Sequence, residues 1–172
     1  MSAARHRALA VALNQPCPRW RRELPGAARL SVAAARAAVA GAGRPLRAPA
    51  ELSIVLGDDA LLRRLNRLWR GQDKPTNVLS FPGEEKPPRA ADAPLLLGDV
   101  VLAFETVLRE AEEQRKRPTD HLRHLVVHGV LHLLGYDHVR VAEARRMEAL
   151  ERAVLGRLGV ADPYRLSEAS HG

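Results

Sequence analysis

Three histidines in the C-terminal half of the sequence have the spacing of metal ligands. His128 and His132 are four residues apart, so on a helix their rings lie one turn apart on one face, within reach of one cation. Gly135 follows and can adopt the left-handed backbone that ends a helix, which lets the chain bring His138 back toward them. The sequence therefore predicts a metal site formed by His128, His132 and His138.

Three neutral imidazoles also indicate which metal and which chemistry to expect. Nitrogen ligands suit Zn²⁺, and three protein ligands leave a tetrahedral Zn²⁺ with one open position, as in catalytic rather than structural sites. A bound Zn²⁺ lowers the pKa of water to about 7 and polarises a carbonyl or phosphoryl oxygen. Ordinary core or surface histidines would explain the first pair alone, but a third histidine after a helix-ending glycine favours one Zn²⁺ per chain and a hydrolase.

Other polar residues near this site have weaker claims as ligands. His121 and His124 lie on roughly the same helix face, one and two turns earlier. Because an open site takes about three protein donors, we expect these two to support the ligands or to face solvent. Asp137 could orient a ligand imidazole, although an aspartate in a turn more often binds its own backbone.

The second position of the histidine motif separates two kinds of hydrolase. The spacing H-x-x-x-H-x-x-G-x-x-H also occurs in metzincin proteases, where the second position is a glutamate that acts as general base. This chain has Gly129 there. Without that carboxylate the protease mechanism lacks its proton acceptor. A zinc metalloprotease-like hydrolase is therefore an alternative and not the first choice.

Longer stretches of the sequence resemble the YbeY endoribonucleases, a family of ribosomal RNA maturation factors. The resemblance rests on three blocks in the family's order, namely LNRLWRGQDKPTNVLSFP at 65–82, LGDVV at 97–101 and HGVLHLLGYDH at 128–138. The run that starts at Met147 and the segment that ends at Tyr164 also resemble the family's C-terminal part. The resemblance therefore covers the chain from about residue 50 onward.

The resemblance implies a metal-dependent, single-strand-specific endoribonuclease that acts in small-subunit rRNA 3′ end maturation and in ribosome quality control. It implies that the three histidines are the metal ligands and that Arg70 is the family's functional arginine. Phosphodiester cleavage develops charge on non-bridging oxygens, and a guanidinium can hold two of them at once. We therefore predict Arg70 and His128 as catalytic residues, with Arg70 also contacting the substrate.

The expected partner is RNA, in single-stranded regions of ribosomal RNA, with ribosomal proteins or assembly factors as further partners. A net charge of +7 and a pI of about 10.6 favour a polyanionic partner, although a base-composition bias toward arginine codons could produce the same charge. Only 3% of residues are aromatic, so we expect nucleic-acid contacts to rest mainly on charge. A non-catalytic ribosome-assembly factor with a structural zinc remains an alternative, which would not need the open metal position.

Cysteine content and hydropathy indicate the compartment. The single cysteine, Cys17, cannot form an intramolecular disulfide, which fits a reducing cytosol. No apolar run approaches the ~18 residues that span a bilayer, and the apolar stretch within Met1 to Leu13 is short for a signal peptide. We therefore expect a cytoplasmic protein without membrane contact.

The elements that must position these residues follow from periodicity and turn signals. Strands are predicted at His6–Leu13, Glu51–Leu56, Asn77–Phe81 and Leu95–Phe104. Helices are predicted at Val32–Ala40 after a Ser31 cap, from Asp58 or Asp59 to Trp69, at Glu105–Arg117, from a Thr119 or Asp120 cap through the histidines, and at Val141–Leu158. The metal ligands should therefore lie on the fourth helix and in the turn after it.

Strands early in the chain and helices late predict the fold class. We expect an α+β fold, with a small mixed sheet packed against several helices and the metal site on a helix of the C-terminal half and the turn after it. Residues 1–172 should form one domain, in which 1–50 are assigned from pattern alone. Residues 83–94 form a proline-rich segment that we expect to be a surface loop, and its length departs from the family's pattern.

Overall fold

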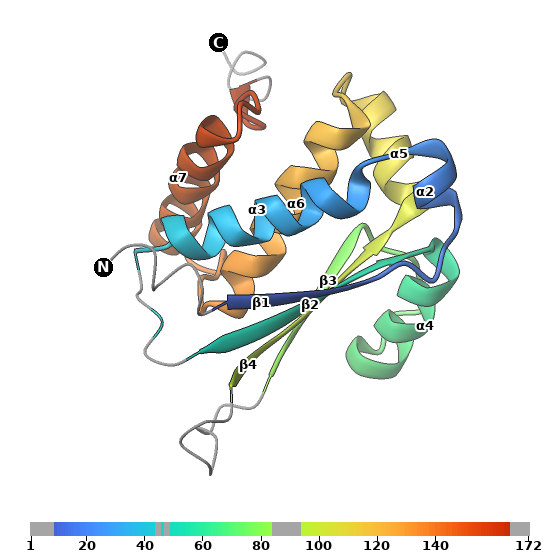
Figure 1. The fold of residues 1–172 in the computed structure, drawn as a ribbon, viewed down its shortest axis with the longest axis horizontal. Coiled ribbons are helices and arrows are strands. Elements are labelled where there is room, and N and C mark those ends of the chain that lie inside the picture. Colours follow the sequence, from blue (N-terminus) through green and yellow to red (C-terminus); the bar gives the residue numbers. More distant parts are fainter. Residues whose placement is uncertain (1–8, 44–45, 47–48, 84–93, 166–172) are drawn as a thin grey trace.

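The computed structural model describes residues 9–43, 46, 49–83 and 94–165, and it has the predicted α+β fold (Figure 1). The strands are β1 (Leu9–Asn14), β2 (Ala50–Gly57), β3 (Val78–Pro82) and β4 (Leu95–Ala103). The helices are α2 (Arg19–Glu23), α3 (Ala27–Gly41), α4 (Asp59–Arg70), α5 (Phe104–Glu113), α6 (Pro118–Leu133) and α7 (Val141–Arg157). Among the described residues, no helix combines the length and apolar character that a membrane span requires.

The four strands form one mixed sheet in the order β1-β2-β4-β3. β1, β2 and β4 are parallel neighbours, and β3 pairs antiparallel with β4 at one edge. Parallel strands need crossover connections, which α3 supplies between β1 and β2. The predicted small mixed sheet is therefore confirmed, and its antiparallel edge strand β3 belongs to the block that precedes the 83–94 segment.

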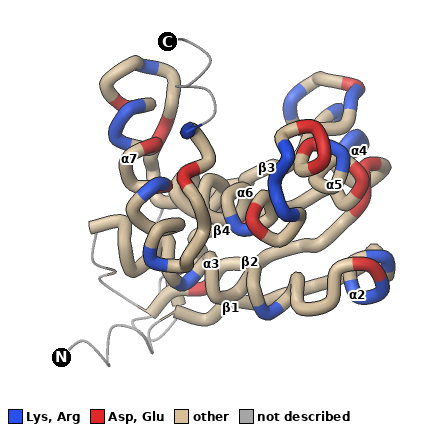
Figure 2. The backbone as a smooth tube through the Cα atoms, turned by 90° about the horizontal axis from the view of Figure 1, so that it is seen from above, with Lys and Arg blue, Asp and Glu red and all other residues tan. Residues whose placement is uncertain are grey.

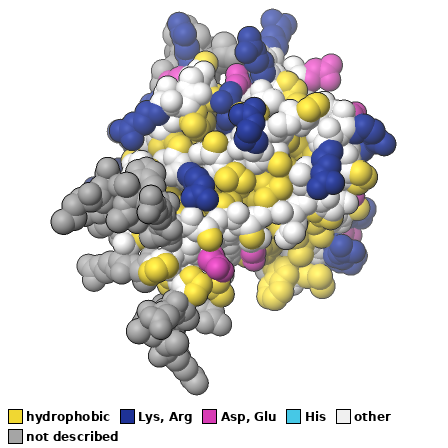
Figure 3. Space-filling view, in the orientation of Figure 1, with side chains coloured by type: hydrophobic (Ala, Val, Ile, Leu, Met, Phe, Trp, Pro, Cys, Tyr) yellow, Lys and Arg dark blue, Asp and Glu magenta, His cyan; other side chains and the backbone are white. Residues whose placement is uncertain are grey.

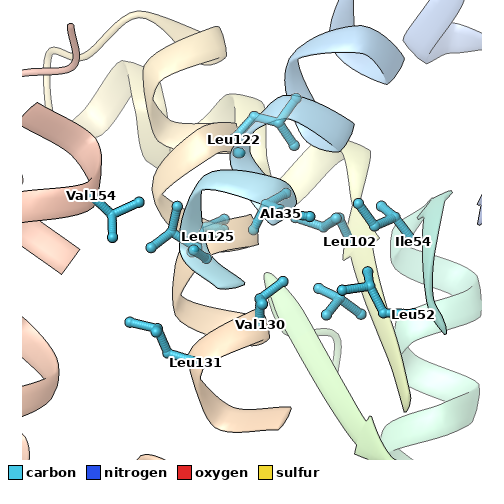
Figure 4. Packing of buried hydrophobic residues seen from close by; sticks show 14 of the residues in the cluster. Ala35, Leu52, Ile54, Leu102, Leu122, Leu125, Val130, Leu131 and Val154 are labelled. Atoms are coloured by element: carbon cyan, nitrogen blue, oxygen red, sulfur yellow. The ribbon is translucent and has the colours of Figure 1, made fainter. Parts of the chain in front are cut away.

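The sheet is covered on both faces, and the alternation along β4 shows how. Val100 and Leu102 belong to the larger core with α3 and α6, whereas Val101 and Ala103 pack in a smaller cluster with Leu62 of α4. Successive strand residues point to opposite faces, so the two helical layers lie on opposite sides of the sheet. Figure 4 shows side chains of the larger core, from the sheet and from α3, α6 and α7, gathered between these elements.

Helix α6, which carries the histidines, is the central helix of the larger layer. It packs against α3, α5 and α7 and against the strands β3 and β4. Residues on several sides of this helix are buried, including Leu122, Val126 and Val130. The metal-binding candidates therefore project from a helix that its neighbours hold in place.

The first half of the chain differs from the prediction in its helices. Helix α3 begins at Ala27 after Gly26, and Ser31 is buried inside the helix instead of capping it. The short helix α2 was not predicted. It is held by Trp20, whose indole nitrogen donates to the Gly57 carbonyl oxygen at 2.8 Å, a contact between distant segments that local patterns do not reveal.

The start of α6 also differs. Thr119 and Asp120 were predicted as caps, but the N-cap is Arg117 and Pro118 occupies the first turn. Proline suits that turn because it lacks the backbone N–H that the turn would leave unpaired. The Asp120 side chain instead accepts a hydrogen bond from Arg123 at 2.7 Å.

Helix α5 is shifted relative to the prediction at both ends. It begins at Phe104, which was assigned to the preceding strand, and it ends at Glu113, before the predicted end at Arg117. Arg115 has a φ of 55°, a left-handed conformation that stops the helix.

Two predictions fall partly outside the described residues. The first strand, predicted at His6–Leu13, is confirmed over residues 9–13 and extends to Asn14, and residues 6–8 lie outside the described part. Of the predicted 83–94 surface loop, residues 84–93 lie outside it as well.

Candidate metal centre

The C-terminal turns of α6 bring the first two histidines together. The ring centroids of His128 and His132 are 4.6 Å apart, and their Nε2 atoms are separated by 3.1 Å. This is the arrangement expected for residues one helical turn apart on one face. Both Nε2 atoms therefore point toward a common position, where a metal ion could accept both lone pairs.

The turn after α6 delivers the third histidine. Gly135 has a φ of 95°, and the amide of Tyr136 donates to the Leu131 carbonyl oxygen at 3.0 Å, which closes the helix end. The Tyr136 hydroxyl donates to the Ala42 carbonyl oxygen at the end of α3 at 2.6 Å. The turn is thus attached to a second helix, and the His138 ring lies 5.1 Å from the His132 ring, centroid to centroid.

The three rings form a cluster that could hold a metal ion. One ring nitrogen from each of His128, His132 and His138 lies within 4.8 Å of the other two. Burial, followed by the charges of His128 and His138, lowers the pKa of His132 below its ordinary value. Its ring therefore stays neutral over a wider pH range, and the neutral imidazole is the form that binds metal. His138 is 61% exposed, so the cluster opens to solvent.

A buried carboxylate contacts one of the three rings on the side away from the other two. Glu151 of α7 is fully buried, and its carboxylate contacts His128 Nδ1 and accepts a hydrogen bond from the Tyr164 hydroxyl. Burial, the largest influence, favours the neutral acid, but hydrogen bonds from His124 and His128 outweigh it and lower the pKa of Glu151 to about 2. The ionised carboxylate holds the proton of His128 on Nδ1, so Nε2 keeps its lone pair for a metal.

Sequence reasoning missed Glu151, although a signal was present. Met147, Glu151 and Leu155 are spaced four residues apart along α7, and all three are buried. A glutamate on the apolar face of an amphipathic helix needs a buried partner, because an unpaired charge there is costly. That partner is the ring of His128, which α6 presents to α7.

Of the remaining polar candidates, His124 and Asp137 behave as expected, whereas His121 neither supports the ligands nor faces solvent. His121 is 3% exposed, and its Nε2 lies 2.9 Å from Glu110, away from the three-histidine cluster. His124 Nε2 lies 3.5 Å from the Glu151 carboxylate, so this ring supports the cluster from outside. Asp137 accepts a hydrogen bond from the backbone amide of His138 at 2.7 Å, which is the turn role weighed above.

Arg70 faces the same cavity as the three histidines. It is the last residue of α4, and it lines a cavity of about 1070 Å³ together with all three rings. Its Nη2 donates to the Ser80 carbonyl oxygen on the edge strand β3 at 3.3 Å. The structure thus brings together the residues that the sequence proposed for metal and substrate, across an edge of the sheet.

The motif between Arg70 and β3 supplies much of the cavity wall. Its lining residues are Gln72, Lys74, Pro75, Thr76 and Asn77, and Ser80 of β3 also lines the cavity. Asp73, which belongs to the same block, instead forms an ion pair with Arg63 of α4, with 2.9 Å between Arg63 Nε and Asp73 Oδ1. Asp73 therefore shapes the loop and does not contribute to the wall.

Comparison with known proteins identifies the family. The profile of the family described as Endoribonuclease YbeY matches residues 28–159. The chain belongs to the YbeY family. The match includes the metal cluster, Arg70 and Glu151, so all of these residues lie within the part that the family shares.

Relatives of this YbeY family member match most of its length. A protein named Endoribonuclease YbeY from Paramagnetospirillum magneticum is 53% identical over 156 residues, which cover 90% of this chain and 94% of that protein. One of the same name from Azorhizobium caulinodans is 55% identical over 143 residues, 83% of this chain and 89% of that protein. The solution structure of TM1509 from Thermotoga maritima has a similar fold, with a TM-score of 0.50, 20% identity, and coverage of 87% of this chain and 91% of that one.

Gly129 distinguishes this YbeY cluster from a metzincin site. A Cβ atom at position 129 would lie 2.8 Å from Val100 Cγ1 and 3.0 Å from the Ser80 hydroxyl oxygen. The Ser80 hydroxyl also donates to the Gly129 carbonyl oxygen at 3.0 Å. Helix α6 therefore packs against the sheet at this residue, and a glutamate there would require Val100, Ser80 or the helix to shift.

Proposed function

We propose that this protein is a metal-dependent endoribonuclease that cleaves single-stranded regions of ribosomal RNA in the cytoplasm. Its proposed tasks are 3′ end maturation of the small-subunit rRNA and ribosome quality control, where ribosomal proteins or assembly factors would be its partners. Membership of the YbeY family and relatives named endoribonuclease support this proposal. The observation that carries it is the cavity shared by Arg70 and the three-histidine cluster.

We assign the metal as one Zn²⁺ held by His128, His132 and His138. The donor set fits Zn²⁺, because it consists of neutral ring nitrogens, one of them oriented by a carboxylate. When bound, the ion supplies a Lewis acid that polarises a phosphoryl oxygen and makes water more acidic. In the described parts of the chain no fourth His, Cys, Asp or Glu joins the cluster, which favours an open catalytic position over a structural zinc.

Arg70 is proposed to hold the scissile phosphate. A guanidinium has five N–H donors, and the hydrogen bond to the Ser80 carbonyl oxygen engages one of its two terminal nitrogens. The donors that face the cavity can contact non-bridging oxygens, where negative charge grows in the transition state. Because Arg70 and the histidines line the same cavity, a phosphate bound there could contact both the metal and the guanidinium.

The remaining basic residues would attract RNA without selecting the reacting phosphate. Lys and Arg are spread over several helices and over the face seen in Figure 3, with acidic residues between them (Figures 2 and 3). Distributed charge of this kind contributes general, salt-dependent affinity for a polyanion. Chemistry at one phosphate therefore depends on the cavity, and capture of the RNA depends on the whole surface.

Cleavage of a single-stranded RNA by the zinc-loaded protein, with and without chelator, tests the proposal. Cleavage should stop with chelator, return with added Zn²⁺, and be absent in His132→Ala, which should also lose its metal by elemental analysis. The same preparations should leave casein intact. Cleavage that persists in His132→Ala would contradict the proposed metal mechanism, and chelator-sensitive proteolysis would favour the metalloprotease alternative.

Arg70→Ala tests the phosphate contact. Its single-turnover cleavage rate should fall on the order of 10²-fold or more, because one placed donor to the transition state is lost. RNA binding should weaken modestly, with the salt slope lower by about one unit, and Arg70→Lys should recover only part of the rate. Arg64→Ala, an exposed position on the same helix, is the control, and an equal rate in both variants would remove Arg70 from the mechanism.

A further inference from the structure

Trp69 is the large aromatic side chain that the fold leaves on the surface next to the cavity. It is 72% exposed, whereas the other tryptophan, Trp20, is completely buried. The chain has only two Trp, two Tyr and two Phe, so few aromatic side chains could contact a ligand. Figure 3 shows apolar side chains at the surface where α4 lies in Figure 1. An exposed indole in this position is a candidate for a ligand contact.

Trp69 is held in place by the strand that also holds Arg70. The rings of Trp69 and Phe81 meet edge to face, with centroids 6.4 Å apart and planes at 61°. Arg70, the next residue of α4, donates to Ser80, the preceding residue of β3. Two consecutive helix residues thus contact two consecutive residues of the edge strand, so the indole and the guanidinium are positioned together.

The edge strand separates Trp69 from the metal cluster. The Ser80 hydroxyl faces α6, where it donates to the Gly129 carbonyl oxygen, while Phe81 packs in the cluster on the α4 face of the sheet. Arg70, the residue after Trp69 in α4, lines the cavity of the histidines. An RNA strand that leaves the cavity past Arg70 could therefore reach Trp69, the adjacent residue of α4.

We propose that Trp69 is a stacking platform for one base of the single-stranded RNA, in the nucleotide next to the phosphate that Arg70 contacts. The inference rests on the proposed function, because the ligand is its substrate. Unpaired bases stack on exposed aromatic rings, whatever their sequence. Arg67 and Arg70, which are exposed in the same last turn of α4 as Trp69, would attract a polyanion, which favours a nucleotide as the occupant. The sequence predicted that RNA contacts rest mainly on charge, and Trp69 would add one aromatic contact to them.

Intrinsic fluorescence of the zinc-loaded protein reports on this contact directly. The probe is a 2′-O-methyl single-stranded oligoribonucleotide, checked on a gel to stay intact, and its comparison is an abasic oligomer of equal charge. Stacking should quench Trp69, while the buried Trp20 provides a constant background. The abasic oligomer should bind by charge without the quenching. Parent fluorescence that does not respond to the base-bearing probe at saturation overturns the proposal.

Substitutions separate stacking from charge. Trp69→Ala should raise the dissociation constant on the order of tenfold with an unchanged salt slope, because stacking releases no counterions, and Trp69→Phe should recover most of the affinity. Leu68→Ala is the matched control, since Leu68 is 66% exposed beside Trp69. Equal affinities of Trp69→Ala and Leu68→Ala would overturn the stacking site. Quenching without any RNA cleavage would support the stacking site and contradict the proposed function. Cleavage without quenching would support the proposed function and contradict the stacking site.

Discussion

Glu151 and Arg70 illustrate how single residues divide the work of the site. Glu151 contacts only protein groups, and through His128 Nδ1 it determines which ring nitrogen is available to a metal. Arg70 lines the open cavity and is available to a substrate. One residue therefore acts through the metal ligands, and the other acts directly on the reacting phosphate in the proposed mechanism.

Glu151→Gln is expected to weaken zinc binding by roughly 10- to 100-fold, because outer partners of ligating histidines typically contribute that much to metal affinity. Glutamine keeps the volume of the side chain but loses the charge that orients His128 and replaces an acceptor oxygen with a donor. Competition with a zinc chelator measures the affinity. Glu148→Gln on the same helix is the control, and equal zinc affinities in the two variants would show that Glu151 does not position His128.

At the scale of elements, the site depends on where helices end. Helix α6 stops at Leu133 and turns through Gly135, which places His138 beside the other rings. Helix α4 stops at Arg70 and turns through Gly71, which has a φ of 67°. In both cases a glycine in the left-handed conformation follows the helix end, next to a residue of the candidate site.

Gly135→Ala should destabilise the fold by about 1–2 kcal/mol, the cost of a left-handed conformation for a residue with a Cβ atom. It should also weaken zinc binding, because relief of the strain moves His138. Gly71→Ala is the control, since it carries a similar strain, with no atom within 4 Å of the added Cβ, far along the chain from the ligands. Denaturant unfolding should show losses in both variants, and chelator competition should show weaker zinc binding only in Gly135→Ala. Unchanged zinc affinity in Gly135→Ala would mean that the turn does not position His138.

At the scale of the whole molecule, Glu110 connects three parts of the fold. From α5 it accepts hydrogen bonds from Asn77, just before β3, at 2.9 Å, and it contacts His121 of α6 at 2.9 Å. Burial, the largest influence, favours the neutral acid, but the bonds from His121 and Asn77 outweigh it and lower the pKa of Glu110 below 4.5. Its stabilising effect is therefore present above pH 4.5 and is lost as the pH falls toward the lowered pKa.

Glu110→Gln should accordingly lower the free energy of unfolding most at neutral pH, and the difference from the parent should shrink as the pH falls below 4.5. Denaturant unfolding at a series of pH values measures this. Glu112→Gln, an exposed position on the same helix, should show no such convergence. If the difference in free energy of unfolding between the parent and Glu110→Gln grew as the pH fell, the pairing of Glu110 with its neighbours would be contradicted.

The sequence by itself determined the features that depend on neighbours along the chain. The spacing of His128 and His132 and the helix-ending Gly135 predicted a cluster within one helix and its turn, because helical periodicity and left-handed glycine are local properties. The order of strands and helices likewise predicted the α+β class and the mixed sheet. The assignment of residues 1–172 to one domain stays a prediction.

Tertiary structure alone decided which distant residues meet the cluster. Glu151 reaches His128 because α7 packs on α6, and Arg70 faces the rings because β3 lies at the edge of the sheet. The sequence did not predict the exposure of Trp69 either, since a tryptophan near the end of an amphipathic helix can equally be buried. Such contacts depend on how elements far apart in the chain pack, and a periodic pattern within one element contains no information about its neighbour in space.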